Sequence, residues 1–377
     1  MRRHFHPTLS LTILLLLVAA CHKHRRIDSG LSMPLRYATN IRCERGDGYS
    51  VWTMRNPWDT TAVLHRYILR HKAGTELPLD DAAPTSVIDV PVGKAGVATA
   101  VHCGLLDELG VADAIAGVCE KEYIDLPAVA RGLADGRIAD FGNGMNPNIE
   151  RIMDVGPDVL LLTPFENSGG YGRVERLGIP IVECAEYMEV SPLARAEWIQ
   201  FYAELFGVGP AADSIFGDVE RRYSSLKRRA SAATSRPRLL TEMPYGGQWF
   251  VPCGQSTMGM MFDDAGADYV FKDLPGSGSK GLAFETVLDQ AHDADLWLVK
   301  YNSPQPLTYS QLLADYQPYS RFRAFREQHI YGCDLAHNHF YLQTPFHPER
   351  LLRDLIILLH PELMPGQQPV YYSPLAQ

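Results

Sequence analysis

The sequence lacks the short motifs that mark the common enzyme classes. It has no Gly-x-Ser-x-Gly turn, no phosphate-binding Walker loop and no dinucleotide fingerprint after a first strand. His102 stands beside Cys103, but neighbours on a strand or helix point apart, so the two form no nucleophile–base pair. Positive charge is also scarce, because 44 acidic residues outnumber 35 basic ones. We therefore expect neither an enzyme nor a nucleic-acid partner.

The first residues resemble a bacterial export signal. Arg2 and Arg3 precede an apolar run at residues 9–18, which small residues and Cys21 close. The run is shorter than the roughly 20 apolar residues that span a bilayer. Its end resembles a lipobox, which predicts a signal peptide at 1–20, a lipid on Cys21 and a tether at 21–33. We expect lipid anchoring on the periplasmic side of a membrane; an ordinary signal with an incidental cysteine is the alternative.

Closely spaced cysteines are absent, which excludes a zinc site of the knuckle type. The compartment permits disulfides, but the sequence cannot assign partners. We expect scattered buried thiols at the remaining positions: Cys43, Cys103, Cys119, Cys184, Cys253 and Cys333.

The body of the chain repeats one pattern in its two halves. In each half a helix end closed by glycine is followed by a short helix with an early glutamate and then by a buried strand. The matching stretches are 106–113, 148–154 and 158–162 in the first half, and 262–268, 283–289 and 295–299 in the second. This duplication predicts an α/β fold with two Rossmann-like lobes, each with a mainly parallel sheet covered by helices.

The remaining elements set the boundaries of these lobes. An amphipathic pattern at 210–234, opened by Pro210 and ended by Pro237, predicts one long inter-lobe helix and only modest closure on ligand binding. We therefore divide the chain into an accessory β segment at 34–84, an N-terminal lobe at 85–209, a helix at 210–235 and a C-terminal lobe at 236–377. Apolar runs predict the other strands: a meander at 36–42, 49–55 and 63–70, then 87–92, 115–119, 179–183, 238–242 and 330–333.

From about residue 85 to residue 363, the order of motifs resembles the iron-complex and vitamin B12 class of periplasmic substrate-binding proteins. The residues that carry the resemblance are 148–152 before 157–161, 177–181, the helix after Pro210, 284–287, and 344–351 with 360–362. The resemblance implies a receptor that gives a metal chelate, such as a ferric siderophore, haem or cobalamin, to an ABC permease dimer. It implies no permanently bound cofactor.

In that family a glutamate on top of each lobe meets arginines of the permease, and the matching residues here are Glu150 and Glu285. Two like charges on rigid lobes would give a symmetric footprint that orients docking. The alternative is that both are solvated acids, stabilised by the N-terminal end of a helix.

A pocket for a bulky chelate needs aromatic walls and a few converging polar groups. The loops expected to face the cleft supply nine candidates: Phe141, Phe165, Tyr171, Tyr245, Trp249, Phe250, Lys280, His339 and Tyr341. Residues 245–250 are expected to form a mobile surface loop, and Lys280 would pair with an anionic chelate. Buried packing of the aromatic residues and simple solvent exposure of Lys280 are the alternatives.

Three histidines support a second hypothesis. His337, His339 and His347 would hold a free zinc or manganese ion, because imidazole nitrogens are common ligands of these metals. The protein would then be a metal-ion or adhesion-type lipoprotein. His339 or Tyr341 would otherwise contact a chelate that already carries its metal.

Overall fold

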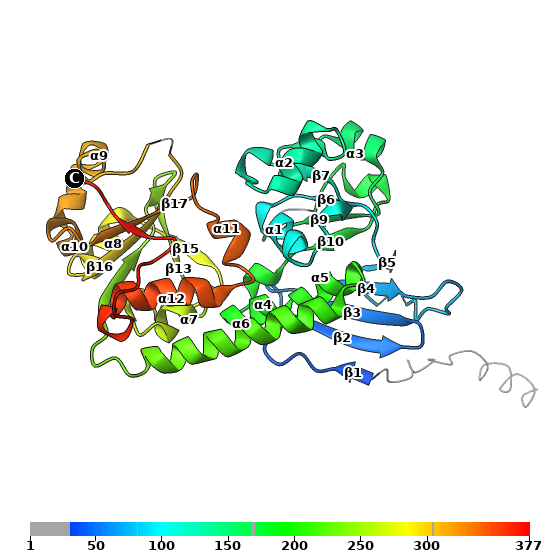
Figure 1. Ribbon diagram of the computed structural model, residues 1–377, viewed down its shortest axis with the longest axis horizontal. Helices are drawn as coiled ribbons and strands as arrows, with labels where there is room; N and C mark the ends of the chain where they lie inside the picture. The colour runs from blue at the N-terminus through cyan, green and yellow to red at the C-terminus, as the bar shows by residue number, and fades with distance from the viewer. Residues whose placement is uncertain (1–30, 81, 167–169, 304) are drawn as a thin grey trace, which may run out of the picture.

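The computed structural model describes residues 31–80, 82–166, 170–303 and 305–377 (Figure 1). The expected signal peptide and lipidated Cys21 lie outside this part of the chain. No helix within it is long and apolar enough to cross a bilayer. The described residues form two lobes side by side, with the long helix α6 (Gly209–Ala230) running beneath both and a separate sheet under the N-terminal lobe.

The first sheet contains five strands in chain order: β1 (Leu31–Met33), β2 (Ile41–Gly46), β3 (Tyr49–Arg55), β4 (Val63–Arg70) and β5 (Thr85–Asp89). The first four are antiparallel, whereas β5 is parallel to β4. The predictions at 49–55 and 63–70 are confirmed. The strand expected at 87–92 belongs to this sheet and not to the N-terminal lobe.

The strand expected at 36–42 was wrong, because two buried carboxylates bind this segment's backbone. Glu197 accepts hydrogen bonds from the backbone N–H groups of residues 36–38, each at 2.8 Å. Glu189 accepts from those of Thr39 and Asn40 at 3.1 and 2.8 Å. Donors bound to these side chains are not available for a ladder of strand hydrogen bonds. Residues 36–40 therefore form a strap that ties the first sheet to the body.

We predict that Glu197→Ala loosens this strap. Removing a charged acceptor from backbone donors costs about 1.5–3 kcal/mol, so trypsin cleavage after Arg36 should accelerate by about tenfold or more. Asp218→Ala, an exposed carboxylate on α6, is the matched control. Limited proteolysis followed by mass spectrometry measures both rates, and equal rates would contradict the assignment.

The N-terminal lobe has a five-stranded parallel sheet in the order β10-β9-β6-β7-β8. Its strands are β6 (Ala95–Val97), β7 (Ile115–Cys119), β8 (Ala139–Gly142), β9 (Val159–Leu162) and β10 (Ile181–Glu183). The helices of this part of the chain are α1 (Ala100–Glu108), α2 (Pro127–Ala134), α3 (Ile149–Val155), α4 (Pro192–Glu197) and α5 (Ile199–Leu205).

The C-terminal lobe repeats this architecture. Its main sheet has the order β14-β11-β16-β17-β18, in which only β18 is antiparallel. The strands are β11 (Arg238–Thr241), β14 (Asp268–Tyr269), β16 (Leu296–Tyr301), β17 (Ile330–Asp334) and β18 (Ser373–Pro374). The helices are α7 (Thr257–Asp264), α8 (Phe284–Ala291), α9 (Tyr309–Asp315), α10 (Arg323–Arg326), α11 (Phe340–Gln343) and α12 (Pro348–Leu359).

Helix α6 joins the two lobes as a rigid strut. The apolar side chains of Phe216 and Val219 are buried, and α6 packs on α5 of the N-terminal half and on α12 of the C-terminal lobe. Tyr223 donates a hydrogen bond to Asp264 at the end of α7, at 2.7 Å. The predicted long helix is confirmed, although it begins at residue 209 and ends at residue 230.

All six cysteines of the described residues are buried and free, as expected. Burial raises the pKa of the Cys43 and Cys119 thiols to about 12, so both are protonated at neutral pH. These thiols pack as small apolar side chains.

A buried histidine joins the lobes where α12 begins. The two ring nitrogens of His347 lie 2.6 Å from Glu108 of α1 and 2.9 Å from Glu349 of α12. Burial alone would lower the pKa of His347, but the hydrogen bonds to the two carboxylates outweigh it and raise the pKa above its ordinary value. The imidazole therefore bridges the two helices.

This bridge predicts a pH-dependent stability. Because the pKa is raised on folding, the stabilisation is complete below about pH 6.5 and is lost as the pH rises through the folded-state pKa. We expect the free energy of unfolding to fall more over this interval in the wild type than in His347→Gln. Urea unfolding from about pH 5 to about pH 9 measures the difference. The same pH dependence in both proteins would contradict the bridge.

Candidate functional site

Each main sheet has one switch point, which is the place between two neighbouring strands where the order in which strands are added to the sheet reverses. In the N-terminal lobe this point lies between β6 and β9, and in the C-terminal lobe it lies between β11 and β16. Connections leave these neighbouring strands in opposite directions, which opens a crevice at their carboxyl ends. The residues that follow these strands are therefore the first candidates for a ligand site.

A cavity of about 770 Å³ lies at the switch point of the N-terminal lobe. Its wall includes residues just after β6, β7 and β9, and the start of α3. The volume lies within the usual range of small-molecule sites. Its larger lining side chains include Glu120, Met145, Ile149, Leu162, Phe165, Glu166, Tyr171 and Arg173.

Glu120 gives this cavity a fixed edge. It follows β7 in a left-handed conformation with φ of 50°, which is uncommon for a residue other than glycine. Its carboxylate accepts hydrogen bonds from the Asn143 side chain and the Gly144 backbone, each at 2.9 Å. Such backbone strain is often found at binding sites, where the surrounding contacts hold it in place.

Two of the aromatic candidates line the cavity. Phe165 is 46% exposed, and Tyr171 is held by a hydrogen bond that its hydroxyl donates to Glu183. Burial raises the pKa of Glu183, so this carboxyl is protonated more readily than an ordinary glutamate. The exposed part of the Phe165 ring offers a surface for an apolar ligand face.

Phe141 does not line the cavity, contrary to the sequence-based expectation. It is 2% exposed and packs beneath the sheet. An added Cβ at Gly117 would lie 2.1 Å from the Phe141 ring, so the glycine makes room for it. The ring faces the core because side chains alternate along β8.

Trp249 is also a core residue, and the mobile loop expected at 245–250 is a short sheet. β12 (Pro244–Tyr245) and β13 (Gln248–Pro252) form a hairpin, which pairs with β15 (Ser279–Leu282). Trp249 is 0% exposed and packs 5.5 Å from Trp297, centroid to centroid. Alternation along the hairpin leaves Tyr245 83% and Phe250 44% exposed. Lys280 of β15 pairs with Val251 of β13, and its side chain is exposed.

At the switch point of the C-terminal lobe, an ion pair occupies the carboxyl ends of the two strands. Glu242 follows β11 with φ of 67°, and its carboxylate lies 2.7 Å from the Lys300 ammonium of β16. Sequence reasoning missed this pair. The sequence signal that could have revealed it is Lys300 itself, a lysine within the otherwise apolar strand β16.

Helix α11 lies between the lobes (Figure 1). It packs so closely on α1 that an added Cβ at Gly104 would lie 2.3 Å from the Leu342 carbonyl oxygen. His339, just before α11, lies 3.8 Å from Asp125 of the N-terminal lobe, and Tyr341 is 47% exposed. The C-terminal candidates His339 and Tyr341 therefore lie at the junction of the two lobes.

The three histidines of the alternative metal site do not converge. His337 contacts Asp334 at 2.8 Å, His339 contacts Asp125, and His347 is buried between Glu108 and Glu349. No group of three metal-binding side chains occurs among the described residues. The expectation that all three histidines share one ion was wrong because each lies beside a different carboxylate.

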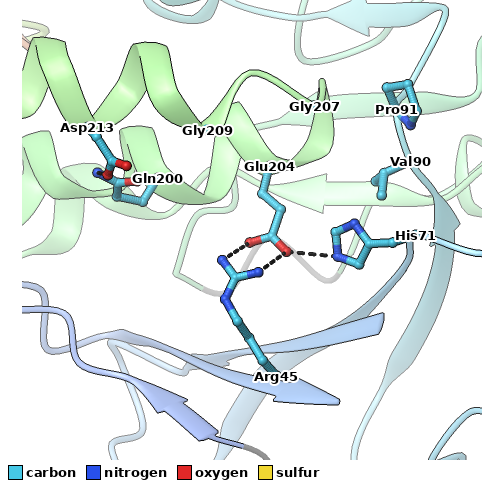
Figure 2. A pocket seen from close by; sticks show the side chains of 9 residues that line it. All are labelled: Arg45, His71, Val90, Pro91, Gln200, Glu204, Gly207, Gly209 and Asp213. Atoms are coloured by element: carbon cyan, nitrogen blue, oxygen red, sulfur yellow. Dashed lines mark hydrogen bonds and ion pairs between the residues drawn. The ribbon is translucent and has the colours of Figure 1, made fainter. Parts of the chain in front are cut away.

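A further cavity of about 380 Å³ separates the first sheet from the start of α6 (Figure 2). Arg45 and His71 both point to Glu204, at 3.1 and 2.9 Å. Glu204 also accepts hydrogen bonds from Ser50 and Trp52 at 2.6 and 3.1 Å. Because this carboxylate is already saturated by donors of the first sheet, the cavity is a structural junction.

Glu150 and Glu285 occupy equivalent places in the two lobes. Each is exposed in the first turn of a short helix, α3 or α8, that follows the cleft-facing loops. Asn148 caps α3 by accepting a hydrogen bond from the Arg151 backbone at 3.0 Å. A negative charge in the first turn also stabilises the helix itself.

Two lobes on a helical strut, with a cavity at a strand switch point, define a binding protein of the rigid, two-lobed class. The sequence pattern of the periplasmic binding protein family matches residues 98–336. The chain therefore belongs to this family, whose members work with ABC transporter permeases. The resemblance and the fold class expected from the sequence are both confirmed.

Several known proteins are similar to the chain. An uncharacterized lipoprotein of Methanocaldococcus jannaschii is 27% identical over 332 residues, which cover 82% of this chain and 76% of the relative. A periplasmic haem-binding protein from Pseudomonas aeruginosa has a TM-score of 0.59 at 17% identity, covering 76% of this chain and 99% of that one. A periplasmic vitamin B12-binding protein of Vibrio cholerae has a TM-score of 0.52 at 14% identity, covering 73% and 99%. The two structures establish the shared fold alone.

Proposed function

We propose that this periplasmic binding protein carries a metal chelate to an ABC importer, the cargo being a ferric siderophore, haem or cobalamin. The observation that carries the proposal is the cavity of about 770 Å³ at the switch point of the N-terminal lobe. Its size exceeds the needs of a bare ion, and Phe165 and Tyr171 offer aromatic surface to a large, partly apolar ligand. The names of two proteins that share the fold, one haem-binding and one B12-binding, agree with such a cargo.

The chelate would bring its own metal. The chain then needs no resident cofactor, and its residues have only to hold the outside of the ligand. Phe165, Tyr171 and Met145 would contact the chelate from the N-terminal lobe, and Tyr341 and His339 from the C-terminal side. Tyr245, Phe250 and Lys280 lie on the small sheet and remain candidates for the outer rim of the site.

Delivery would use Glu150 and Glu285 as the two contacts with the permease dimer. One exposed acid on each lobe provides matched sites for basic residues on the two permease halves. The helix α6 would hold the two acids at a nearly constant separation. The name of the Methanocaldococcus relative supports a lipid anchor, which we assign to Cys21.

Titration of the purified full chain in detergent tests the cargo. Calorimetry with haem, a ferric catecholate, a ferric hydroxamate, cobalamin and free zinc should show saturable one-to-one binding of one chelate. Phe165→Ala should weaken that binding by about tenfold, because a partly exposed ring loses its ligand contact. Tight binding of zinc with no response to any chelate would contradict the proposal and favour a metal-ion receptor.

A further inference from the structure

Lys300 lies at the carboxyl end of the C-terminal switch point, beside helix α11 at the junction of the lobes. Strand β16 continues beyond the end of β11, since the last paired residues of the two strands are Thr241 and Leu298. Lys300 therefore lies beyond the last pair of β11 and β16, at the carboxyl end of the switch point. Its side chain keeps 17% of its surface accessible.

The contacts of Lys300 satisfy only part of its bonding capacity. Its ammonium lies 2.7 Å from Glu242 and 5.6 Å from the centre of the Phe340 ring. The Tyr341 and Tyr372 phenols also lie near enough to interact with its charge. Because an ammonium group carries three donors, it can bind a second acceptor without losing the first.

The environment keeps this lysine charged. Burial by itself would lower the pKa of Lys300, but the Glu242 carboxylate outweighs burial and the pKa is raised. At the N-terminal switch point, the residues after β6 and β9 include the neutral Thr99 and Thr163. The charged residues of its cavity lie elsewhere on the wall: Glu120, Glu166 and Arg173. The two halves of the duplicated fold therefore differ in charge at equivalent places.

A purely structural ion pair explains these facts less well. Both side chains are mostly shielded from water. The attraction within such a buried ion pair often does not offset the free energy of desolvating the two charges. Glu242 also holds a left-handed backbone conformation, which costs about 1–3 kcal/mol. Strain and a desolvated charge at one strand end are typical of a ligand site.

We propose that Lys300 is the residue that recognises a negative group of the bound chelate, and that Glu242 holds the ammonium in place until the ligand arrives. This inference rests on the proposed function and narrows the cargo to an anionic chelate. The negative group would be a carboxylate or catecholate oxygen that accepts a hydrogen bond from the Lys300 ammonium. Glu242 would repel the same group, so it would limit affinity.

Matched pairs of chelates that differ only in charge test this inference. Suitable pairs are haem with its dimethyl ester, N-succinyl with N-acetyl ferrioxamine B, and a cobalamin monocarboxylic acid with cobalamin. For the pair that the wild type binds, Lys300→Gln should weaken the affinity for the anionic chelate by about 10- to 100-fold. The affinity for the neutral chelate should fall by less than about threefold. Lys300→Arg should restore most of the loss, and Glu242→Gln should strengthen binding of the anionic member. Thermal unfolding of each variant checks that it folds.

The outcomes distinguish an error in the role of Lys300 from an error in the proposed function. Suppose that the wild type binds a chelate while Lys300→Gln lowers the affinity for both chelates of a pair equally, or for neither. In that case the role of Lys300 is wrong, and the proposed function as a chelate receptor is unaffected. If the wild type binds no member of any pair, the proposed function fails and the inference fails with it.

Discussion

Charge reversal at both Glu150 and Glu285 is expected to reduce chelate uptake to background while leaving chelate affinity unchanged. Both acids are exposed in the first turns of α3 and α8, one on each lobe. Lysine at both positions would replace two attractions to basic permease residues with two repulsions, and like charges at an interface cost several kcal/mol. Each single reversal should reduce uptake by about tenfold.

The measurement is transport of a radiolabelled chelate into vesicles that contain the permease, with affinity measured separately by calorimetry. The matched control is Asp154→Lys with Asp289→Lys, because these exposed acids lie on the same two helices one turn later. Normal uptake by the Glu150 and Glu285 double variant would rule out the docking assignment. A loss of chelate affinity would show that these residues act in the binding site.

The second large effect is expected in stability. Trp249→Ala should reduce the free energy of unfolding by about 3–5 kcal/mol, the usual cost of truncating a large buried aromatic residue. Trp249 packs against Trp297 and Phe322, with ring centroids 5.5 and 5.7 Å away, and donates a hydrogen bond to the Thr241 carbonyl at 3.0 Å. Its removal would leave both a cavity and an unpaired carbonyl.

The neighbouring Phe250→Ala variant is the control. Phe250 is 44% exposed on the opposite face of β13, so its loss should change the free energy of unfolding by less than about 0.5 kcal/mol. Urea unfolding monitored by circular dichroism compares the two variants. Equal losses of stability would show that buried and exposed side chains do not alternate along β13.

The architecture could be predicted from the sequence because it depends on local, periodic patterns. The two glutamate helices and the strands after them repeat along the chain, and the structure places them at equivalent points of two sheets. The long helix was recognisable from its apolar stripe. The strap at residues 36–40 was not, because its hydrogen bonds go to carboxylates about 150 residues away.

The candidate site was only partly predictable. Phe165 and Tyr171 line the cavity, whereas Phe141 and Trp249 point into the core from short strands. The face that a residue occupies depends on the register of a strand, and a shift by one residue reverses it. The Glu242–Lys300 pair joins two strands that are far apart in the sequence, so only the folded sheet brings it together.

The central proposal is that a chelate binds at the switch-point cavity of the N-terminal lobe and contacts the C-terminal residues at the lobe junction. Hydrogen–deuterium exchange of the purified chain with and without the chelate that it binds tests this most directly. The account predicts slower exchange at residues 98–99, 144–149 and 335–343, with little change in the first sheet. Protection confined to the first sheet, or to the junction around Glu204, would contradict it.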